Sequence, residues 1–387
     1  MQNKPILLFV VNEAYFFVSH RMPIAVEAQR QGYDVHIAAP GDNVWAPADY
    51  SVDELAKLGL TFHKIPMSRR GTRPWQELRT FLALVRLYRR LRPDIVHHLT
   101  IKPNLYGGIA ARLTGVPCVV YAITGLGQMF VASEGVLRLL RPLVLIFMRI
   151  AFGHGNARVI IQNVSDRGFL VNNGVVDLGG TVLIQGSGVD LTLFKPMPEP
   201  AGEPVVILPS RLIWEKGIQE FVDAARQLQR DGVAARFVVI GSTHPSNPRA
   251  VPEHTLNEWV ASGCIEWWGR REDMPEIFAQ CHIVCQPSKY GEGVPKVLLE
   301  AAAAARPVVA TDTAGCREVV ADGVEGLLVP AGDAGALAGA LRRLIEASQE
   351  RGAMGKAART RAEASFGIAT VVNTTLDIYS DLRAISS

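Results

Sequence analysis

Cysteine is scarce in this sequence, and its few residues suit no disulfide framework. They are odd in number, scattered, and mostly set in apolar strand-like segments: Cys118, Cys264, Cys281, Cys285 and Cys316. Such a distribution is typical of reduced thiols in a protein core. No secretory leader is expected, because the apolar start MQNKPILLFVV leads straight into a polar loop instead of a small-residue cleavage site. We therefore expect a cytoplasmic protein.

A large net charge is lacking as well, since the formal net charge is only +3. With 48% hydrophobic and 20% charged residues and no repetitive tract beyond a short alanine run, the composition is that of a globular protein. No nucleic-acid partner is expected. The first 190 residues hold 20 basic and 13 acidic residues, about +7, and the remainder about −4. The basic excess therefore lies in the first half.

Long uncharged apolar runs are also absent. The most apolar stretch, LRLLRPLVLIFMRIAF from Leu137, contains Arg138, Arg141 and Arg149, which leave too short a run for the ~20 residues of a membrane-spanning helix. We expect it at most to dip into a membrane surface.

A second stretch, SRRGTRPWQELRTFLALVRLYRRLRPD, places basic and apolar residues on different faces of a helix. Arg79, Arg86 and Arg90 share one face, and the other face holds Leu78, Leu82, Val85 and Leu91. Such a helix either sits on anionic lipid or is an ordinary solvated helix packed on a sheet. The sequence leaves both interpretations open.

What the sequence does contain is a repeated alternation of short Val- and Ile-rich runs with longer helical patterns. The first series is ILLFVV, DVHIAA, TFHKI, DIVHHL, CVVYAI, RVIIQN and TVLIQ, and the second is EPVVILPS, ARFVVIGS, CIEWWG, HIVCQPS, RPVVATD and EGLLVPAG. Continuous apolar runs are typical of parallel strands buried on both faces. The Pro-rich stretch 193–204 between the series is interpreted as a linker. We predict an α/β protein of two Rossmann-like domains, residues 1–190 and 191–369, with a C-terminal helix at about 370–387 that packs back on the first.

The loops after strands are where such folds bind ligands, and two of them carry suitable charges. Arg211 and Lys216 follow VVILPS on a turn that we expect to be exposed, and two cations there suit a diphosphate. Glu292 lies in the loop after HIVCQPS, Pro295 is expected in the first helical turn, and Glu300 lies two turns further. Paired carboxylates also occur in glycoside hydrolases, but eight helical steps rise ~12 Å, which is too far without a bend in the turn.

These motifs resemble the retaining glycosyltransferases of family 4, which have the two-domain GT-B fold. The resemblance is dense in PSRLIWEKG, WWGRREDM, PSKYGEGVPKVLLEA, RPVVATDTAGCREVV and DGVEGLLVPAGDAGALA. In the first half, KPNLYGGIAARL, ITGLG and GSGVD are similar to a bacterial branch that acts on polyprenyl-diphosphate-linked saccharides. The resemblance implies an acceptor domain, a nucleotide-sugar-binding domain and a donor site in the cleft between them.

By this resemblance, Arg211 and Lys216 hold the donor diphosphate, Glu292 the transferred sugar and Glu300 the ribose. The backbone around Arg270 and Arg271 would contact the base, and the segment Gly293, Val294 and Pro295 would bring amides toward the sugar and phosphate. The two glutamates would then grip opposite ends of one nucleotide-sugar. No protein nucleophile, metal or cofactor is expected.

Some positions depart from the family pattern. Ala305 stands where a glycine is usual, the first loop VVNEAYFFVSHR lacks a glycine pair, and Thr124 and Gly125 stand where many relatives have a histidine. These departures leave the identity of a side-chain base open. The candidates for the acceptor side rest on position alone: Asn12, Glu13, His20, Lys102 and Thr124. His97, His98 and His282 are interpreted as core or strand-end residues.

The function predicted is transfer of a sugar, with an N-acetylhexosamine on UDP as the preferred donor, to a lipid-linked saccharide of O-antigen, capsule or another surface glycan. The protein would be cytoplasmic and peripheral on the inner face of the plasma membrane. One alternative is an isomerase similar to the UDP-N-acetylglucosamine 2-epimerases, which share the architecture. Another is a nucleotide-sugar-binding protein without turnover, which the presence of Arg211, Lys216 and both glutamates disfavours.

Overall fold

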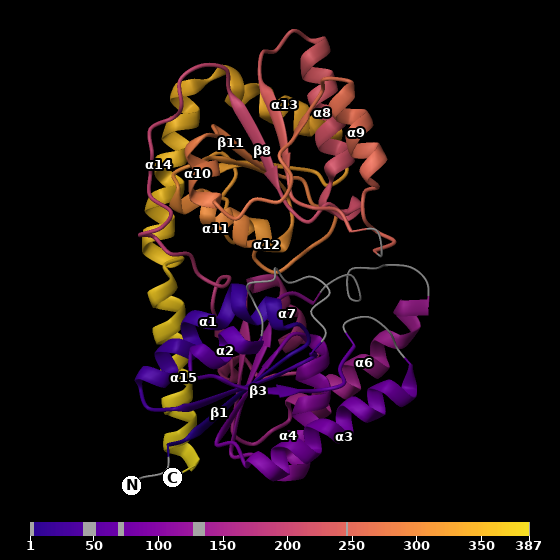
Figure 1. Ribbon diagram of the computed structural model, residues 1–387, viewed down its shortest axis with the longest axis vertical. Helices are drawn as coiled ribbons and strands as arrows, with labels where there is room; N and C mark the ends of the chain where they lie inside the picture. Colours follow the sequence, from indigo (N-terminus) through magenta and orange to yellow (C-terminus); the bar gives the residue numbers. More distant parts are fainter. Residues whose placement is uncertain (1–3, 42–51, 69–72, 127–135, 245–246, 387) are drawn as a thin grey trace. The chain divides into compact units, whose positions relative to one another are not determined.

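The computed structural model describes residues 4–41, 52–68, 73–126, 136–244 and 247–386 (Figure 1). The chain divides into two compact units: unit 1 comprises Met1–Ser187 and Ala369–Ser387, and unit 2 comprises Gly188–Ile368. The boundary predicted from the sequence lies between Asp190 and Leu191, with a C-terminal helix belonging to the first domain.

Unit 1 is built on a seven-stranded parallel sheet in the order β3-β2-β1-β4-β5-β6-β7. The strands are β1 Ile6–Val11, β2 Asp34–Ala39, β3 Thr61–Lys64, β4 Ile95–Leu99, β5 Cys118–Ile123, β6 Ala157–Ile161 and β7 Thr181–Leu183. The helices are α1 Ala14–Arg30, α2 Val52–Lys57, α3 Pro74–Leu91, α4 Gly108–Thr114, α6 Val136–Phe152, α7 Val164–Asn172 and α15 Ile368–Ser386. Two short turns of helix, η1 Pro103–Gly107 and η2 Leu178–Gly180, complete the unit.

The helices of unit 1 cover both faces of its sheet, and right-handed crossovers explain which helix lies on which face. The chain moves in one direction through β4, β5, β6 and β7, so α3, α4, α6 and α7 lie on a single face. Their inward side chains, such as Leu84, Ala111, Met148 and Leu170, belong to one hydrophobic cluster with the sheet. None of the helices described combines the length and apolar character needed to cross a bilayer.

The apolar face predicted for α3 is only partly buried. Val85 is 9% exposed, but Leu78 and Leu82 are 44% and 39% exposed. Leu84, Leu87 and Tyr88 are the residues buried against the sheet. Both interpretations of this helix, on lipid or solvated, therefore stay open. The side chain of Arg138, singled out in the sequence, lies outside the described residues.

Helix α15 packs on unit 1 through buried polar and aromatic contacts. The Tyr379 hydroxyl lies 2.6 Å from His97 Nδ1, and the Asn156 side chain donates to the Leu382 carbonyl at 2.8 Å. His98 Nε2 lies 2.8 Å from the Tyr88 hydroxyl. These contacts confirm that the two strand histidines are core residues. All five cysteines are free and buried, as the sequence predicted.

Unit 2 has a six-stranded parallel sheet in the order β10-β9-β8-β11-β12-β13. The strands are β8 Val205–Pro209, β9 Arg236–Ile240, β10 Glu266–Trp267, β11 Ile283–Gln286, β12 Val308–Thr311 and β13 Gly326–Val329. The helices are η3 Trp214–Lys216, α8 Ile218–Arg230, α9 Glu253–Ala261, α10 Met274–Ala279, α11 Lys296–Ala303, α12 Ala314–Arg317, α13 Ala334–Glu346 and α14 Ser348–Ser365. Side chains of α8, α9 and α13 form the core on one face, and those of α10 and α11 on the other. The predicted α/β fold with two Rossmann-like sheets is confirmed.

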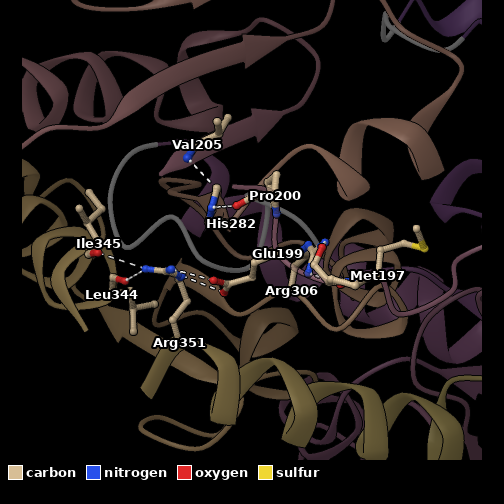
Figure 2. A network of polar contacts seen from close by, with 10 residues as sticks. Met197, Glu199, Pro200, Val205, His282, Arg306, Leu344, Ile345 and Arg351 are labelled. Atoms are coloured by element: carbon tan, nitrogen blue, oxygen red, sulfur yellow. Dashed lines mark hydrogen bonds and ion pairs between the residues drawn. The ribbon is translucent and has the colours of Figure 1, made fainter. Parts of the chain in front are cut away.

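The stretch 193–204, interpreted as a linker, is instead held against unit 2 by two buried arginines (Figure 2). Arg306 donates to the carbonyls of Met197 and Pro198 at 2.9 and 3.1 Å. Arg351 holds both carboxylate oxygens of Glu199 at 2.9 and 2.7 Å. The sequence could not reveal this, because the two arginines lie more than a hundred residues further along the chain.

Candidate active site

The strand order of unit 2 indicates where a ligand should bind. From β8 the chain moves to β9 and β10 on one side, and it later returns to β11 on the other. In a doubly wound sheet, ligands bind beyond the carboxyl ends of the strands at this switch point. The loops after β8 and β11 carry Arg211, Lys216 and Glu292, so the sheet brings together charges that are about eighty residues apart.

Lys216 and Glu292 form the centre of this candidate site. The Lys216 Nζ lies 2.6 Å from each carboxylate oxygen of Glu292. The two side chains are only 9% and 22% exposed. The expectation of an exposed Lys216 is therefore wrong, because η3 folds this side chain toward the β11 loop. Arg211 is exposed, as expected.

Two further polar residues, which the sequence analysis missed, orient Glu292. Gln286, the last residue of β11, donates its amide to the Ser288 hydroxyl at 2.8 Å, and Ser288 lies 2.9 Å from Glu292 Oε1. Since a hydroxyl has one hydrogen and Ser288 accepts from Gln286, that hydrogen points to the carboxylate. The Thr311 hydroxyl at the end of β12 also holds the Ser288 carbonyl at 2.7 Å. The only sequence signal was two polar residues at the end of an apolar run.

The surroundings of Glu292 keep its carboxylate ionised. Burial alone would raise its pKa, but the Lys216 ammonium, the Ser288 hydroxyl and the more distant Arg211 charge together lower the pKa below its ordinary value. A carboxylate with this environment is suited to accepting hydrogen bonds from hydroxyl groups, as the hydroxyls of a sugar would supply.

Two glycines let neighbouring loops approach the Glu292 loop. Gly217, with φ at +73°, would place a Cβ 1.9 Å from the Pro287 carbonyl oxygen. Gly315, in α12, would place one 1.9 Å from the Gly293 carbonyl oxygen and 2.8 Å from that of Glu292. Any larger residue at either position would displace the backbone that carries Glu292.

Glu300 lies on α11 and is 8% exposed. Burial raises its pKa, and Lys296, whose Nζ is 3.5 Å away, offsets part of this effect. Pro295 is the N-cap of α11 and not, as predicted, in its first turn, because the helix begins at Lys296. Gly293, Val294 and Pro295 are all buried at this helix start.

Arg270 and Arg271 follow β10, at the same carboxyl edge of the sheet but two strands from β8. With strands ~4.8 Å apart, this is roughly 10 Å along the edge. Arg270 pairs with Glu272 at 3.3 Å, and Arg271 holds Asp273 with one contact of 2.8 Å. Their side chains thus bind neighbouring carboxylates, which is compatible with a role for their backbone alone.

The acceptor-side candidates lie in unit 1, where β1, β4 and β5 are neighbours. Asn12, Lys102 and Thr124 each follow one of these strands, and Glu13 is the N-cap of α1. Lys102 binds Glu77 at 2.6 Å and the Ser68 carbonyl at 3.0 Å.

The imidazole of His20 contacts its own helix. It lies 2.6 Å from the Ser19 hydroxyl and stacks on Phe16 at 4.4 Å. These contacts leave the acceptor-side role of His20 a prediction.

Side chains that could bind a metal do not gather in the described part of the chain. No three His, Cys, Asp or Glu residues among those described cluster as a metal site requires. His282 is a strand-end residue, as predicted, and accepts from the Val205 amide at 3.0 Å. That turnover needs no metal stays a prediction.

Comparison with known proteins shows what the whole chain is similar to. Residues 6–161 match the family model "Glycosyl transferase 4-like", and residues 203–347 match "Glycosyl transferases group 1". One relative is the N,N'-diacetylbacillosaminyl-diphospho-undecaprenol alpha-1,3-N-acetylgalactosaminyltransferase of Campylobacter jejuni, 26% identical over 84% of this chain and 85% of that protein. Another is the UDP-Gal:alpha-D-GlcNAc-diphosphoundecaprenol alpha-1,3-galactosyltransferase of Escherichia coli, 25% identical over 79% and 80%.

The fold is also similar to that of Anabaena HepE, solved in complex with UDP and glucose. The TM-score is 0.75 at 20% identity, over 98% of this chain and 100% of that one. The two Rossmann-like sheets thus define a GT-B fold, and the two family matches identify the chain as a glycosyltransferase. The chain belongs to glycosyltransferase family 4.

Proposed function

We propose that the protein is a retaining glycosyltransferase that moves a sugar from a nucleoside diphosphate to a polyprenyl-diphosphate-linked saccharide. The product would belong to a surface polysaccharide or a related glycan. Two relatives named above act, by their names, on undecaprenol-diphosphate-linked sugars, and they align over most of this chain. We further propose that the enzyme works in the cytoplasm, at the inner face of the membrane that holds such an acceptor.

The observation that carries this proposal is the meeting of Arg211, Lys216 and Glu292 at the switch point of unit 2. Two cations at the carboxyl end of β8 can stabilise the negative charge that grows on a leaving diphosphate. An ionised Glu292 beside them can hold the hydroxyls of the departing sugar.

The proposed reaction needs no protein nucleophile. The bond between the anomeric carbon and the diphosphate oxygen breaks, and the acceptor hydroxyl oxygen bonds to that carbon on the same face. The acceptor proton passes to the leaving phosphate. The protein contributes orientation and charge stabilisation, with Gly293, Val294 and Pro295 supplying backbone amides.

The donor we prefer is a UDP-linked N-acetylhexosamine. Glu300 would accept from the ribose hydroxyls, and the backbone at Arg270 and Arg271 would contact the base. The similarity to a protein that transfers N-acetylgalactosamine and to a fold solved with UDP supports this choice. No metal or other cofactor is proposed.

The test is incubation with a set of UDP- and GDP-sugars, with and without a polyprenyl-diphosphate-linked saccharide. Release of nucleoside diphosphate that depends on the lipid-linked acceptor, together with an axial or equatorial anomeric bond matching that of the donor, would support the proposal. Conversion of the sugar without acceptor would favour the epimerase-like alternative. Binding with no turnover on any acceptor would leave only the binding-protein interpretation.

A further inference from the structure

Half of the exposed large apolar side chains in the described part of the chain lie on three helices of unit 1. These helices, α3, α4 and α6, carry eight of the sixteen. The eight are Trp75, Leu78 and Leu82 of α3, Leu113 of α4, and Leu143, Ile146, Phe147 and Ile150 of α6. We call these eight residues the three-helix surface.

The three helices are neighbours on one face of the sheet. Helix α4 contacts both α3 and α6, and the inward residues of all three join one hydrophobic cluster. Figure 1 shows them on the same side of the unit 1 sheet. Since their opposite sides are buried, the exposed residues point away from the sheet. On α6 they recur at intervals of three and four residues, which makes one continuous apolar stripe.

Apart from Glu77, the charged residues of these helices are arginines. Arginines flank the apolar residues, and five of them are exposed on α3 and α4: Arg79, Arg86, Arg89, Arg90 and Arg112. The single acidic residue of the three helices is Glu77, and it is bound by Lys102 at 2.6 Å. An apolar surface bordered by positive charge therefore results.

We infer that the three-helix surface docks on an anionic lipid bilayer, with its apolar side chains entering the interface and its arginines meeting the headgroups. Amphipathic helices that combine Trp, Phe and Leu with Arg bind membranes in this way, lying in the plane of the interface. Trp75, which is 79% exposed, is the kind of side chain that favours the headgroup level.

A second copy of the chain fits this surface less well. A twofold interface pairs the same surface of both copies, so it would bring two arginine-bordered surfaces together, and like charges brought together oppose association. An anionic bilayer supplies the opposite charge and an apolar layer together.

The inference rests on the proposed function only because a lipid-linked acceptor would bring the enzyme to a membrane. Binding is measured without donor or acceptor, so either proposal can fail alone. The experiment is co-sedimentation of the full chain with phosphatidylcholine vesicles containing one quarter phosphatidylglycerol, over a range of salt. Pure phosphatidylcholine vesicles are the neutral comparison. The wild type should bind the anionic vesicles at low salt, and binding should weaken as salt rises.

Two sets of variants separate the apolar and the charged contributions. The double variant Ile146→Gln, Phe147→Gln should bind roughly tenfold or more weakly, because two large side chains no longer enter the interface. The triple variant Arg79→Glu, Arg86→Glu, Arg90→Glu removes three positive charges and adds three negative ones, so binding should weaken by at least about fivefold for each arginine replaced. The matched control, Leu178→Gln with Val324→Gln, changes exposed apolar residues elsewhere and should bind like the wild type. Thermal melting followed by circular dichroism checks that all variants are folded.

A fluorescent label tests which surface inserts. Because the five native cysteines are buried, Phe147→Cys can be labelled selectively with an environment-sensitive dye, and Leu178→Cys serves as the control. The label at 147 should brighten and shift to the blue only with anionic vesicles. A concentration-dependent change without vesicles would mean that a second copy covers the surface and would overturn the inference. So would the absence of wild-type binding at low salt, or equal responses at the two positions.

Discussion

Substitution of Gly315 by alanine tests whether the backbone position of the Glu292 loop controls turnover. The new Cβ would stand 1.9 Å from the Gly293 carbonyl oxygen, whereas ordinary contacts begin at 3.4 Å. Something must therefore move by about 1.5 Å, and the atoms nearest to the Cβ belong to the backbone that carries Glu292. A misplacement of about 1 Å at a reacting centre can lower a rate ~10²-fold.

The same substitution should cost about 1–3 kcal/mol of unfolding free energy, as other overpacked sites do. Most of the protein should remain folded at this cost. We therefore expect kcat to fall roughly a hundredfold in a folded enzyme. Steady-state transfer assays give kcat and KM, and urea titration gives the unfolding free energy.

Gly339→Ala is the matched control. Gly339 lies on α13, and a Cβ there meets nothing within 4 Å. Alanine in a helix interior should stabilise the protein by up to about 1 kcal/mol relative to glycine, with turnover unchanged. If folded Gly315→Ala turned over within a few-fold of Gly339→Ala, the position of the Glu292 loop would not limit the reaction.

Four further outcomes are expected. Arg211→Ala and Lys216→Ala should each reduce transfer ~10²- to 10³-fold. Only Lys216→Ala should also lower the unfolding free energy, because it leaves the largely buried Glu292 without its ion-pair partner. Equal stability of the two variants would contradict this. In calorimetric titration with a free nucleoside diphosphate, Glu292→Ala should bind almost like the wild type and Glu300→Gln more weakly, and the reverse ranking would mean that the two carboxylates are assigned to the wrong ends of the donor. Ser288→Ala removes a hydrogen bond to the charged carboxylate of Glu292, worth about 1.5–3 kcal/mol. The kcat should therefore fall at least tenfold, and the acid limb of the pH profile of kcat should move to higher pH. An unmoved profile would show that Ser288 does not act on the Glu292 carboxylate. The pKa of Glu300 is raised in the folded protein. Its contribution to the unfolding free energy is therefore present below the ordinary glutamate pKa and is lost as pH rises through the raised value. Urea titrations of Glu300→Gln should lack this loss, and an identical pH dependence of wild type and variant would count against the reasoning.

The strands were predictable because the signal for a buried parallel strand is local. Each of the runs singled out in the sequence, from ILLFVV to EGLLVPAG, overlaps one strand of the structure. Such runs are apolar because both faces of the sheet are covered. The periodicity of α3 was less informative, because residues on its outer side, Leu78 and Leu82, are themselves apolar and imitate a core-facing stripe.

The site was predictable only in its composition. Charged residues in loops after strands could be recognised one by one, but their contacts depend on β8 and β11 being neighbours, which periodicity does not reveal. Ser288 and Gln286 were missed for the same reason. Ala305, in contrast, was recognised from the sequence alone. The sequence marked it as a departure from a usual glycine, and the structure gives it φ of +55°, the left-handed region where glycine is favoured.

The pairing of Lys216 with Glu292 changes how the two residues should work together. A buried ion pair contributes little to stability beyond what well-packed apolar residues would give, so the fold alone does not explain it. An ammonium has three hydrogens, and the two contacts of 2.6 Å to the carboxylate use two of them. The third remains for a phosphate oxygen. Under the proposed function, Lys216 would therefore contact both the carboxylate that holds the sugar and the diphosphate of the donor. The carboxylate that holds the sugar would be fixed by the same cation that stabilises the leaving group.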